Sequence, residues 1–214
     1  MFNFLTKKIT RRQLDRFLIK YQTTVRILDI GSGGSSYARY FPNRFCVDID
    51  PARNPDLVAD AHCLPFADGE FEAILSTEML EHTTNPKQVV NELMRVLKPG
   101  GRLILTTRFV YPLHDSPHDY FRFTKYGLKE LFKDYQIVEL VPETQSFSAI
   151  AALLQRLAFQ GQFRFDKLVK FKLLVWAFCL SHLDWLIVRE FGDIKKETVD
   201  DHLFTTGWYV VVQK

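Results

Sequence analysis

Several signatures that would settle the chemistry of this 214-residue chain are missing from its sequence. Cys46, Cys63 and Cys179 form no Cys-x-x-Cys pair, so the simplest interpretation is reduced, buried thiols in a cytoplasmic protein. No glycine loop ends in Gly-Lys-Ser or Gly-Lys-Thr, which excludes a P-loop. No Tyr-x-x-x-Lys pair occurs either, so the catalytic pair common in short-chain dehydrogenases is absent.

Long hydrophobic runs are missing as well. The most apolar uncharged run in the C-terminal third, residues 173–183, is about half as long as the roughly 20 residues that a membrane-spanning helix needs. The apolar stretch at residues 1–5 is too short for a signal peptide, and basic residues follow it. We therefore expect a cytoplasmic protein that at most makes a peripheral contact with the inner face of a membrane.

The chain has little excess charge of either sign: it contains 28 Lys and Arg and 25 Asp and Glu, and its net charge is +3. This balance gives no support to a nucleic-acid partner. Aromatic residues are abundant instead: 19 Phe, 8 Tyr and 3 Trp make up 14% of the chain, which implies an aromatic core or an apolar surface with a purpose. The length fits one domain with elaborations, at about 150 residues per domain.

Strand-like apolar runs alternate with helical patterns from residue 25 onward, which predicts an α/β fold with a parallel sheet. The expected strands are 25–30, 45–49, 56–60, 71–76, 102–107, 136–141 and 207–212. The expected helices are 35–41, 86–97 and 124–132, preceded by an N-terminal helix within residues 1–24 that has a basic face. Residues 147–190 are apolar and aromatic on most faces, which predicts two further helices, separated near Gly161, as an insertion before the last strand.

A glycine loop directly follows the first expected strand, in the run Leu28-Asp29-Ile30-Gly31-Ser32-Gly33-Gly34-Ser35. Glycines there permit positive φ and let a ligand lie against the backbone, with helix N–H groups pointing at it. Asp48 and Asp50 end the second strand about 17 to 19 residues after Gly31, near the roughly 20-residue spacing at which a carboxylate reaches a ribose. The loop therefore indicates a ligand that contains a nucleoside.

Two nucleotide chemistries fit a loop of this kind. A dinucleotide requires a third glycine for close packing around its pyrophosphate, and Ser36 occupies that position. Asp29 lies inside the strand before the loop, where its charge would repel phosphate and would suit an amino group or a sulfonium. A nicotinamide-dependent oxidoreductase therefore stays open but is disfavoured.

Five motifs in this order resemble the class I S-adenosylmethionine-dependent methyltransferases, most of all the subgroup with ubiquinone/menaquinone-type and small-molecule O- and N-methyltransferases. They are Leu28–Ser35, Val47–Asp50, Val58–Ala61 with Leu64–Phe66, Phe71–His82, and Leu97–Gly101. The resemblance covers about residues 24–141 and departs from the family at Ser35, where a third loop glycine is usual. It implies one methyltransferase domain over residues 1–214, with a cofactor-binding core at 25–141. Its sheet would be Rossmann-like and doubly wound, with about seven strands, mostly parallel, and an antiparallel last strand at 206–213.

The resemblance also implies which residues hold the cofactor S-adenosylmethionine. Gly31, Ser32 and Gly33 would lie under its amino-acid end, with Asp29 near the ammonium group. Asp48 would hold the ribose hydroxyls. The remaining implied contacts surround the adenine and close the site: Ile49, Asp60, Ala61, His62, Thr77 and Glu78.

The chemistry is expected near the loop of residues 111–124, which is rich in His, Asp and Tyr. A hydroxyl acceptor benefits from a general base, and His118 is the leading candidate. The other candidates are His82 and Asp119 for catalysis and His114, Tyr120 and Arg122 for recognition of the acceptor. A structural role is equally supported, because Asp119 could pair with Arg122 and Tyr120 could fill the core.

The same loop raises a metal interpretation, because His114 and His118 alternate with Asp115 and Asp119. Pro117 breaks the helix that would bring the two His residues onto one face, and metal-independent relatives predominate in the family. No metal is therefore expected.

The predicted function is methyl transfer from S-adenosylmethionine to oxygen of a small-molecule, glycan or lipid-linked acceptor. Two other classes stay open: a non-catalytic partner subunit with the same fold, and the nicotinamide-dependent oxidoreductase. A nucleic-acid methyltransferase is disfavoured, because Ser76-Thr77-Glu78-Met79 stands where base methylases carry Asn/Asp-Pro-Pro-Tyr/Phe.

The apolar helices at 147–190 have three interpretations. They would serve as a lid on the sheet edge, as a platform for a hydrophobic acceptor or a membrane surface, or as a homodimer interface. Lys167, Lys170 and Lys172 lie beside the apolar stripe, and basic residues in that place favour anionic lipid. The sequence alone leaves the three open.

Overall fold

The computed structural model describes residues 3–34, 37–200 and 202–214. The chain divides into two compact units. The sheet unit comprises residues 17–109, 113–141 and 208–214, and the helical unit comprises residues 1–16, 110–112 and 142–207. The expectation of a single domain over the whole chain stays a prediction.

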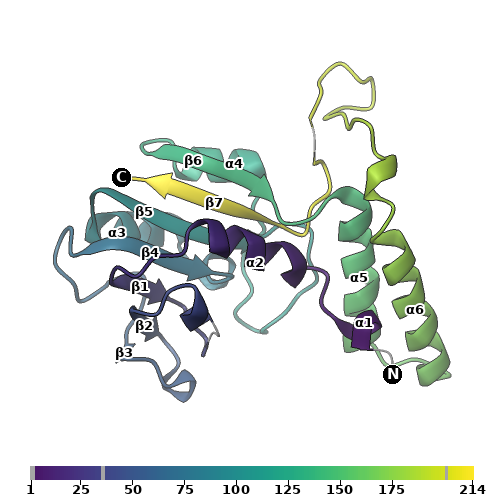
Figure 1. The fold of residues 1–214 in the computed structure, drawn as a ribbon, viewed down its shortest axis with the longest axis horizontal. Coiled ribbons are helices and arrows are strands. Elements are labelled where there is room, and N and C mark those ends of the chain that lie inside the picture. Colours follow the sequence, from purple (N-terminus) through teal and green to yellow (C-terminus); the bar gives the residue numbers. More distant parts are fainter. Residues whose placement is uncertain (1–2, 35–36, 201) are drawn as a thin grey trace. The chain divides into compact units, whose positions relative to one another are not determined.

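A seven-stranded sheet has the strand order β3-β2-β1-β4-β5-β7-β6 (Figure 1). Its strands are β1 (Ile27–Ile30), β2 (Arg44–Asp48), β3 (Leu57–Val58), β4 (Phe71–Thr77), β5 (Leu97–Arg108), β6 (Gln136–Pro142) and β7 (Gly207–Gln213). The pairs β1–β2, β1–β4, β2–β3 and β4–β5 are parallel. Lys214 exchanges hydrogen bonds with Gly100 and Gly101, which places the end of β7 beside the beginning of β5, so β7 is antiparallel. All seven expected strands are present, and the predicted fold class is confirmed.

Helices cover both faces of the sheet. Figure 1 shows α3 (Pro86–Val96) and α4 (Lys125–Leu131) behind the strands, where their apolar side chains join a buried core that includes Leu28 and Ile74. The C-terminal part of α2 (Arg11–Lys20) lies on the near face, where Phe17 stacks on Tyr209 with ring centroids 4.8 Å apart. Alternate residues of each strand therefore serve the two faces, as the pleat requires.

The two helices on the far face begin where the sequence predicts. The side-chain oxygen of Asn85 accepts a hydrogen bond from the N–H of Gln88 at 3.2 Å, and Pro86 occupies the first helical position of α3. The Thr124 hydroxyl caps α4 by accepting from the N–H of Gly127 at 3.0 Å. These caps fix the start of each helix against the sheet.

The order of the sheet reverses at β1, which has β2 on one side and β4 on the other. In a doubly wound sheet, ligands bind at the carboxyl ends of the strands beside this switch. The carboxyl ends of β1, β2 and β4 carry Gly31, Asp48 and Thr77 respectively. The topology therefore brings the predicted cofactor residues to one edge of the sheet.

The short helix expected at residues 35–41 is present only in part, and it is not an α-helix. The described part of that segment holds one 3₁₀ turn, η1 (Tyr37–Arg39), while Ser35 and Ser36 lie outside the described residues. Pro42 disfavours helical backbone at the residue before it, which leaves too short a stretch for an α-helix.

The predicted N-terminal helix is divided into α1 (Asn3–Thr6) and α2. Gln155 of the helical unit takes the backbone groups at the break: its Nε2 donates to the carbonyl oxygens of Leu5 and Lys7, and its Oε1 accepts from the N–H of Ile9, each at 3.1 Å. Groups that would otherwise extend the helix are thereby satisfied by a side chain 146 residues away from Ile9.

In the helical unit, α5 (Ser146–Gln160) and α6 (Asp166–Leu180) form the predicted pair of apolar helices and lie side by side (Figure 1). Ala151, Ala152 and Ala177 are buried in their contact, together with Ile9. The break near Gly161 is confirmed, since this residue caps α5. Within the described ranges, we find no helix whose length and hydropathy would carry it across a bilayer.

The three cysteines are free thiols, but their predicted burial is wrong. Cys63 and Cys179 are exposed and Cys46 is half-buried. Cys63 follows β3 in a surface loop. Cys179 is two residues from the buried Ala177, which is about 200° around a helix, so it faces away from the packed side of α6.

Candidate functional site

The glycine loop after β1 has a backbone that few other residues allow. Gly31, Gly33 and Gly34 have φ angles of 66°, 53° and 69°, in the left-handed region that glycine enters without strain. A Cβ on Gly31 would lie 2.4 Å from Cγ of Met79, whereas a Cβ on Gly34 would meet nothing within 4 Å. The N–H groups of Gly31 and the buried Ser32 donate to a carbonyl oxygen of β2 at 2.8 and 3.3 Å. One side of the loop is therefore packed and the other is open.

Asp48, at the end of β2, reaches this loop. Its Oδ2 accepts from the N–H of Gly33 at 2.8 Å, and its Oδ1 accepts from the N–H of Asp50 at 3.0 Å. Ile49, the next residue, exposes 67% of its surface although it is apolar. A carboxylate beside an open glycine loop, followed by an exposed apolar side chain, has the chemistry that a ribose and an adenine ring require.

Asp29 is fully buried within β1. Its Oδ2 accepts from Nη1 of Arg44 at 2.6 Å, and 12% of the Arg44 side chain is exposed. The guanidinium balances a carboxylate that would be costly to bury alone. This pair gives Asp29 a structural role, and its predicted place near the ammonium of the cofactor stays a prediction.

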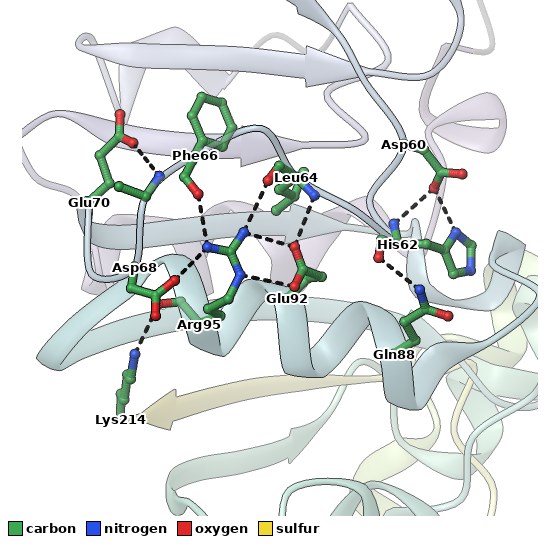
Figure 2. A network of polar contacts seen from close by, with 11 residues as sticks. Asp60, His62, Leu64, Phe66, Asp68, Glu70, Gln88, Glu92, Arg95 and Lys214 are labelled. Atoms are coloured by element: carbon green, nitrogen blue, oxygen red, sulfur yellow. Dashed lines mark hydrogen bonds and ion pairs between the residues drawn. The ribbon is translucent and has the colours of Figure 1, made fainter.

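Asp60 and His62 form a tight turn after β3, on either side of Ala61 (Figure 2). Oδ1 of Asp60 accepts from the backbone N–H of His62 at 2.9 Å and lies 2.6 Å from Nδ1 of its ring. Nε2 of the ring accepts from the N–H of Asn85 at 3.3 Å, so the ring proton is assigned to Nδ1. The hydrogen bond from the His62 N–H lowers the pKa of Asp60, which is therefore charged at neutral pH.

One face of α3 holds the loop that carries this turn. Figure 2 shows Gln88, Glu92 and Arg95 turned towards the loop, as their spacing of four and then three residues predicts. Nε2 of Gln88 donates to the carbonyl oxygen of His62 at 2.9 Å, and Oε2 of Glu92 accepts from the N–H of Leu64 at 3.0 Å.

Arg95 joins the loop to the helix at several points (Figure 2). Its guanidinium donates to the carbonyl oxygens of Leu64 at 3.0 Å and Phe66 at 2.8 Å, and to Oδ1 of Asp68 at 2.7 Å. It also pairs with Glu92, and this hydrogen bond lowers the pKa of the Glu92 carboxyl. Contacts within the chain thus fix the segment bearing Asp60 to α3, which reduces the entropy lost when a ligand binds.

Thr77 and Glu78 lie at the carboxyl end of β4, as predicted. Glu78 has a φ of 52°, and its N–H donates to the carbonyl oxygen of Thr106 at 2.9 Å. Its carboxylate pairs with Nη2 of Arg108 at 2.7 Å, and the Arg108 side chain is 2% exposed. The strained backbone at Glu78 is therefore held in place by β5.

A cluster of Glu and His side chains lies beyond the ends of β4 and β5. Glu81 and His82, in the 3₁₀ turn η3 (Leu80–His82), and His114, after β5, bring ligand atoms within 4.8 Å of one another. The rings of His82 and His114 meet edge to face, with centroids 4.7 Å apart. Nδ1 of His82 donates to the carbonyl oxygen of His118 at 2.5 Å, which leaves Nε2 as its accepting nitrogen.

Glu81 anchors the loop of residues 111–124 while its own side chain is fully buried. Its carbonyl oxygen accepts from the N–H groups of Tyr120 and Phe121 at 3.0 and 3.1 Å. Oε2 accepts from the Thr107 hydroxyl at 2.7 Å, and Oε1 has no hydrogen-bond partner among the residues that the structure describes. Burial raises the pKa of Glu81, while the charge of Arg108 acts against this increase.

Asp119 orders the same loop. Its oxygens accept from Nη1 and Nη2 of Arg122, both at 2.6 Å, which confirms the predicted pair. Oδ2 also accepts from the N–H of His114 at 3.0 Å and lies 3.3 Å from Nδ1 of its ring. The Arg122 hydrogen bonds lower the pKa of Asp119, and burial lowers the pKa of His114. At neutral pH the loop therefore holds a charged carboxylate against a neutral imidazole.

His118 and Tyr120 lie at the outside of the loop. The ring of His118 is exposed, and its Nδ1 lies 3.0 Å from the hydroxyl of Tyr120, which is 46% exposed. The interpretation that Tyr120 fills the core is therefore wrong, because the anchoring of its backbone by Glu81 turns the side chain outward. It is the backbone of His118, through its carbonyl oxygen, that contacts His82.

Glu81, His82 and His114 have the spacing of metal ligands, and they differ from the set that the sequence raised. The buried Oε1 of Glu81 would gain a partner from a cation. The positive charges of Arg108 and Arg122, which contribute to the lowered pKa of His114 after burial, would repel one. The expectation of no metal stays a prediction.

Sequence reasoning missed Met79, Glu81 and Arg108. Met79 supports the glycine loop from the chain after β4, Glu81 anchors the His-rich loop, and Arg108 holds Glu78. A usable signal existed for Arg108, because it stands at the end of the β-forming run Leu103–Thr107. Such a charge must find a buried partner.

Residues 28–105 match the family model described as a methyltransferase domain. The chain is 34% identical to the tocopherol O-methyltransferase of Arabidopsis thaliana, over 38% of this chain and 30% of that protein. It is 30% identical to the ubiquinone biosynthesis O-methyltransferase of Dechloromonas aromatica, over 55% of this chain and 65% of that protein. The chain therefore spans less than two thirds of the length of each relative.

The fold has wider parallels. The solved structure of the [4+2]-cyclase SpnF superimposes with a TM-score of 0.59, over 98% of this chain and 80% of that one. The identity in this superposition is 16%, so the likeness concerns the fold alone.

Proposed function

Because residues 28–105 belong to the methyltransferase domain family, we propose that the whole chain transfers a methyl group from S-adenosylmethionine to an acceptor hydroxyl. The domain implies this cofactor, which supplies an electrophilic methyl on a sulfonium. The residues of the chain bind and orient the reactants, and methyl transfer by in-line displacement gains much of its rate from such positioning.

The observation that carries the proposal is the open glycine loop with Asp48 beside it. Gly31 packs on Met79, while the position of a Cβ on Gly34 is free of neighbours, so a ligand has room to lie against the loop at Gly34. The Asp48 carboxylate and the exposed Ile49 stand next to this space. These groups fit the amino-acid, ribose and adenine parts of the cofactor in the order that the sequence predicted.

The names of the relatives and the chemistry of the polar cluster support a hydroxyl acceptor. Both relatives described above are named O-methyltransferases. A hydroxyl must lose its proton during transfer, and the cluster beyond β4 and β5 contains imidazoles that can accept one. We therefore place the acceptor, a hydroxyl of a small-molecule, glycan or lipid-linked compound, at this cluster.

We propose His114, rather than His118, as the group that accepts the proton. Burial lowers the pKa of His114, so the ring is neutral at pH 7, and Asp119 lies 3.3 Å from Nδ1 to orient it. His118 is exposed and contacts only Tyr120 through its ring among the described residues. We therefore assign the base to His114, with His82 beside it, and Arg122 holds Asp119 in place.

Binding of S-adenosylhomocysteine to two neighbouring variants tests the site. Asp48→Ala removes the carboxylate at the loop, whereas Asp50→Ala, its control, removes one that accepts from Ala52 outside the loop. We expect calorimetry to show at least about tenfold weaker binding for Asp48→Ala, since a charged hydrogen bond contributes about 1.5–3 kcal/mol. Equal affinities for the two variants would contradict the placement of the ribose.

The fold alone does not fix the reaction, as the likeness to a cyclase illustrates. A cofactor-binding partner subunit without turnover therefore remains the second candidate. Transfer of a labelled methyl group to a panel of hydroxyl acceptors separates the two, because the partner subunit would bind the cofactor and label none of them. Binding of NADH instead would favour the oxidoreductase.

A further inference from the structure

Helix α6 is apolar on most sides, yet little of it is buried. Ala177 is 1% exposed, whereas Leu168, Phe171 and Trp176 expose 55%, 47% and 62% of their surfaces. At 100° per residue, these exposed positions fall on one face about 140° wide, opposite Ala177. The outer face of α6 consists of Leu168, Phe171, Lys172, Trp176 and Cys179.

Apolar exposure continues beyond both ends of the helix. Phe165, just before α6, is 75% exposed. Trp185, in the 3₁₀ turn η4 (Asp184–Leu186), is 76% exposed, and Val188 is 97% exposed. Scattered apolar residues are ordinary on a protein surface, but a run of this kind along one helix and its flanks marks a surface that binds something.

Positive charge accompanies this surface. Arg164, Lys167 and Lys172 are exposed, while Lys170 pairs with Asp166 at 3.0 Å. The residues of the helical unit include 13 Lys and Arg against 9 Asp and Glu, and those of the sheet unit include 15 against 16. The helical unit therefore carries the whole positive excess of the chain.

We propose that the outer face of α6 docks on the surface of an anionic phospholipid bilayer. Phe171 and Trp176 would enter the boundary between headgroups and acyl chains, where aromatic rings are favoured. Lys167 and Lys172 would extend their stems along the apolar surface and place their ammonium groups among lipid phosphates. The helix would lie in the plane of the interface, as helices of mixed apolar and basic character do.

Two other occupants fit this face less well. A second copy of the chain, related by a twofold axis, would bury Lys172 and set like charges of the two copies against each other. Interface cores are depleted in Lys for this reason. A membrane-spanning role is excluded by length, since the 15 residues of α6 extend about 22 Å and a bilayer core is about 30 Å thick.

Sedimentation with vesicles tests the proposal and needs neither cofactor nor acceptor. Vesicles of equal parts phosphatidylglycerol and phosphatidylcholine should retain the protein about tenfold better than phosphatidylcholine alone, and high salt should release it. The double substitutions Phe171→Ser with Trp176→Ser, and Lys167→Glu with Lys172→Glu, should each abolish retention. Tyr126→Ser is the control, because Tyr126 is 61% exposed on α4 and lies outside the proposed surface.

Fluorescence gives a second readout, since the tryptophan emission should shift to the blue on binding in the wild type and not in the Phe171/Trp176 variant. Circular dichroism and calorimetry with S-adenosylhomocysteine confirm that each variant is folded. No retention of the wild type on anionic vesicles, or undiminished retention of both double variants, would overturn the proposal. A dimer in ultracentrifugation that the Phe171/Trp176 variant loses, with no vesicle binding, would assign the face to a second copy.

Discussion

At the scale of single residues, the polar loop after β5 depends on one ion pair. The Asp119 side chain is 2% exposed and accepts two hydrogen bonds from Arg122. Because a partner removed from such a pair leaves the other charge uncompensated, Asp119→Asn should lower the free energy of unfolding by about 2–4 kcal/mol. Urea denaturation measures this loss. Glu130→Gln, in the exposed pair with Lys133, is the control and should change nothing measurable; similar losses in both variants would refute the special role of Asp119.

The same pair makes stability depend on pH. The Arg122 hydrogen bonds hold the pKa of Asp119 below its ordinary value of about 3.9. The folded state therefore binds fewer protons than the unfolded state in that range, so the contribution of the pair is complete above about pH 4 and is lost as the pH falls further. The difference in unfolding free energy between wild type and Asp119→Asn should shrink between about pH 4 and pH 2. A difference independent of pH would show that charge is not its source.

The choice of base is a second prediction at this scale. His114→Ala should lower kcat by about 10²–10³-fold and leave the affinity for S-adenosylmethionine unchanged, because a general base acts on the acceptor. His118→Ala is the matched control and should keep most of the activity, since its ring is exposed. The pH profile of kcat/KM for the wild type should have an acid limb whose apparent pKa is below the ordinary His value of about 6.5, because burial lowers the pKa of His114. Greater damage from His118→Ala would return the role to the residue that the sequence favoured.

For single residues, the sequence predicted which residues lie at the site better than it predicted their hydrogen-bond and ion-pair partners. Asp48 was placed at a ribose contact from its spacing, and the structure puts it against the glycine loop. Glu81 escaped attention because its burial depends on Thr107 and Arg108, which belong to another strand. Partners of this kind depend on the register of β4 and β5, which the sequence does not state.

At the scale of elements, α3 and the loop after β3 behave as one piece. Arg95→Met would remove the hydrogen bonds to Leu64, Phe66 and Asp68 and should lower the free energy of unfolding by about 1–2 kcal/mol. It should also weaken S-adenosylhomocysteine binding several-fold, because Asp60 stands on the freed loop. Thermal denaturation and calorimetry measure the two effects. The control is Lys98→Met, which breaks an exposed pair with Glu72. An equal loss of unfolding free energy in this variant would show that Arg95 does not anchor the loop.

The elements that sequence reasoning located well are those set by local chemistry. Strands appeared as buried apolar runs, and α3 as a helix with Pro near its start and apolar residues on one side. The break between α1 and α2 was not predictable in this way, because Gln155 is remote in sequence from the backbone groups it satisfies. Local propensity cannot anticipate a competitor supplied by another helix.

At the scale of the whole molecule, the net charge of the chain conceals a difference in charge between its two units. The net charge of +3 gave no sign that the helical unit holds the positive excess and the sheet unit is close to neutral. The units are also interleaved in sequence, since residues 110–112 belong with the helices and residues 113–141 with the sheet. A sequence read in order could identify the apolar insertion, but not which other segments fold with it.

Binding of S-adenosylmethionine by the glycine loop and Asp48 underlies every functional role proposed for this protein. Its most direct test is a calorimetric titration of the unaltered protein with S-adenosylmethionine and, in parallel, with NADH. We expect saturable one-to-one binding of S-adenosylmethionine at micromolar concentration and no heat of binding with NADH. No binding of S-adenosylmethionine, or preference for NADH, would contradict it.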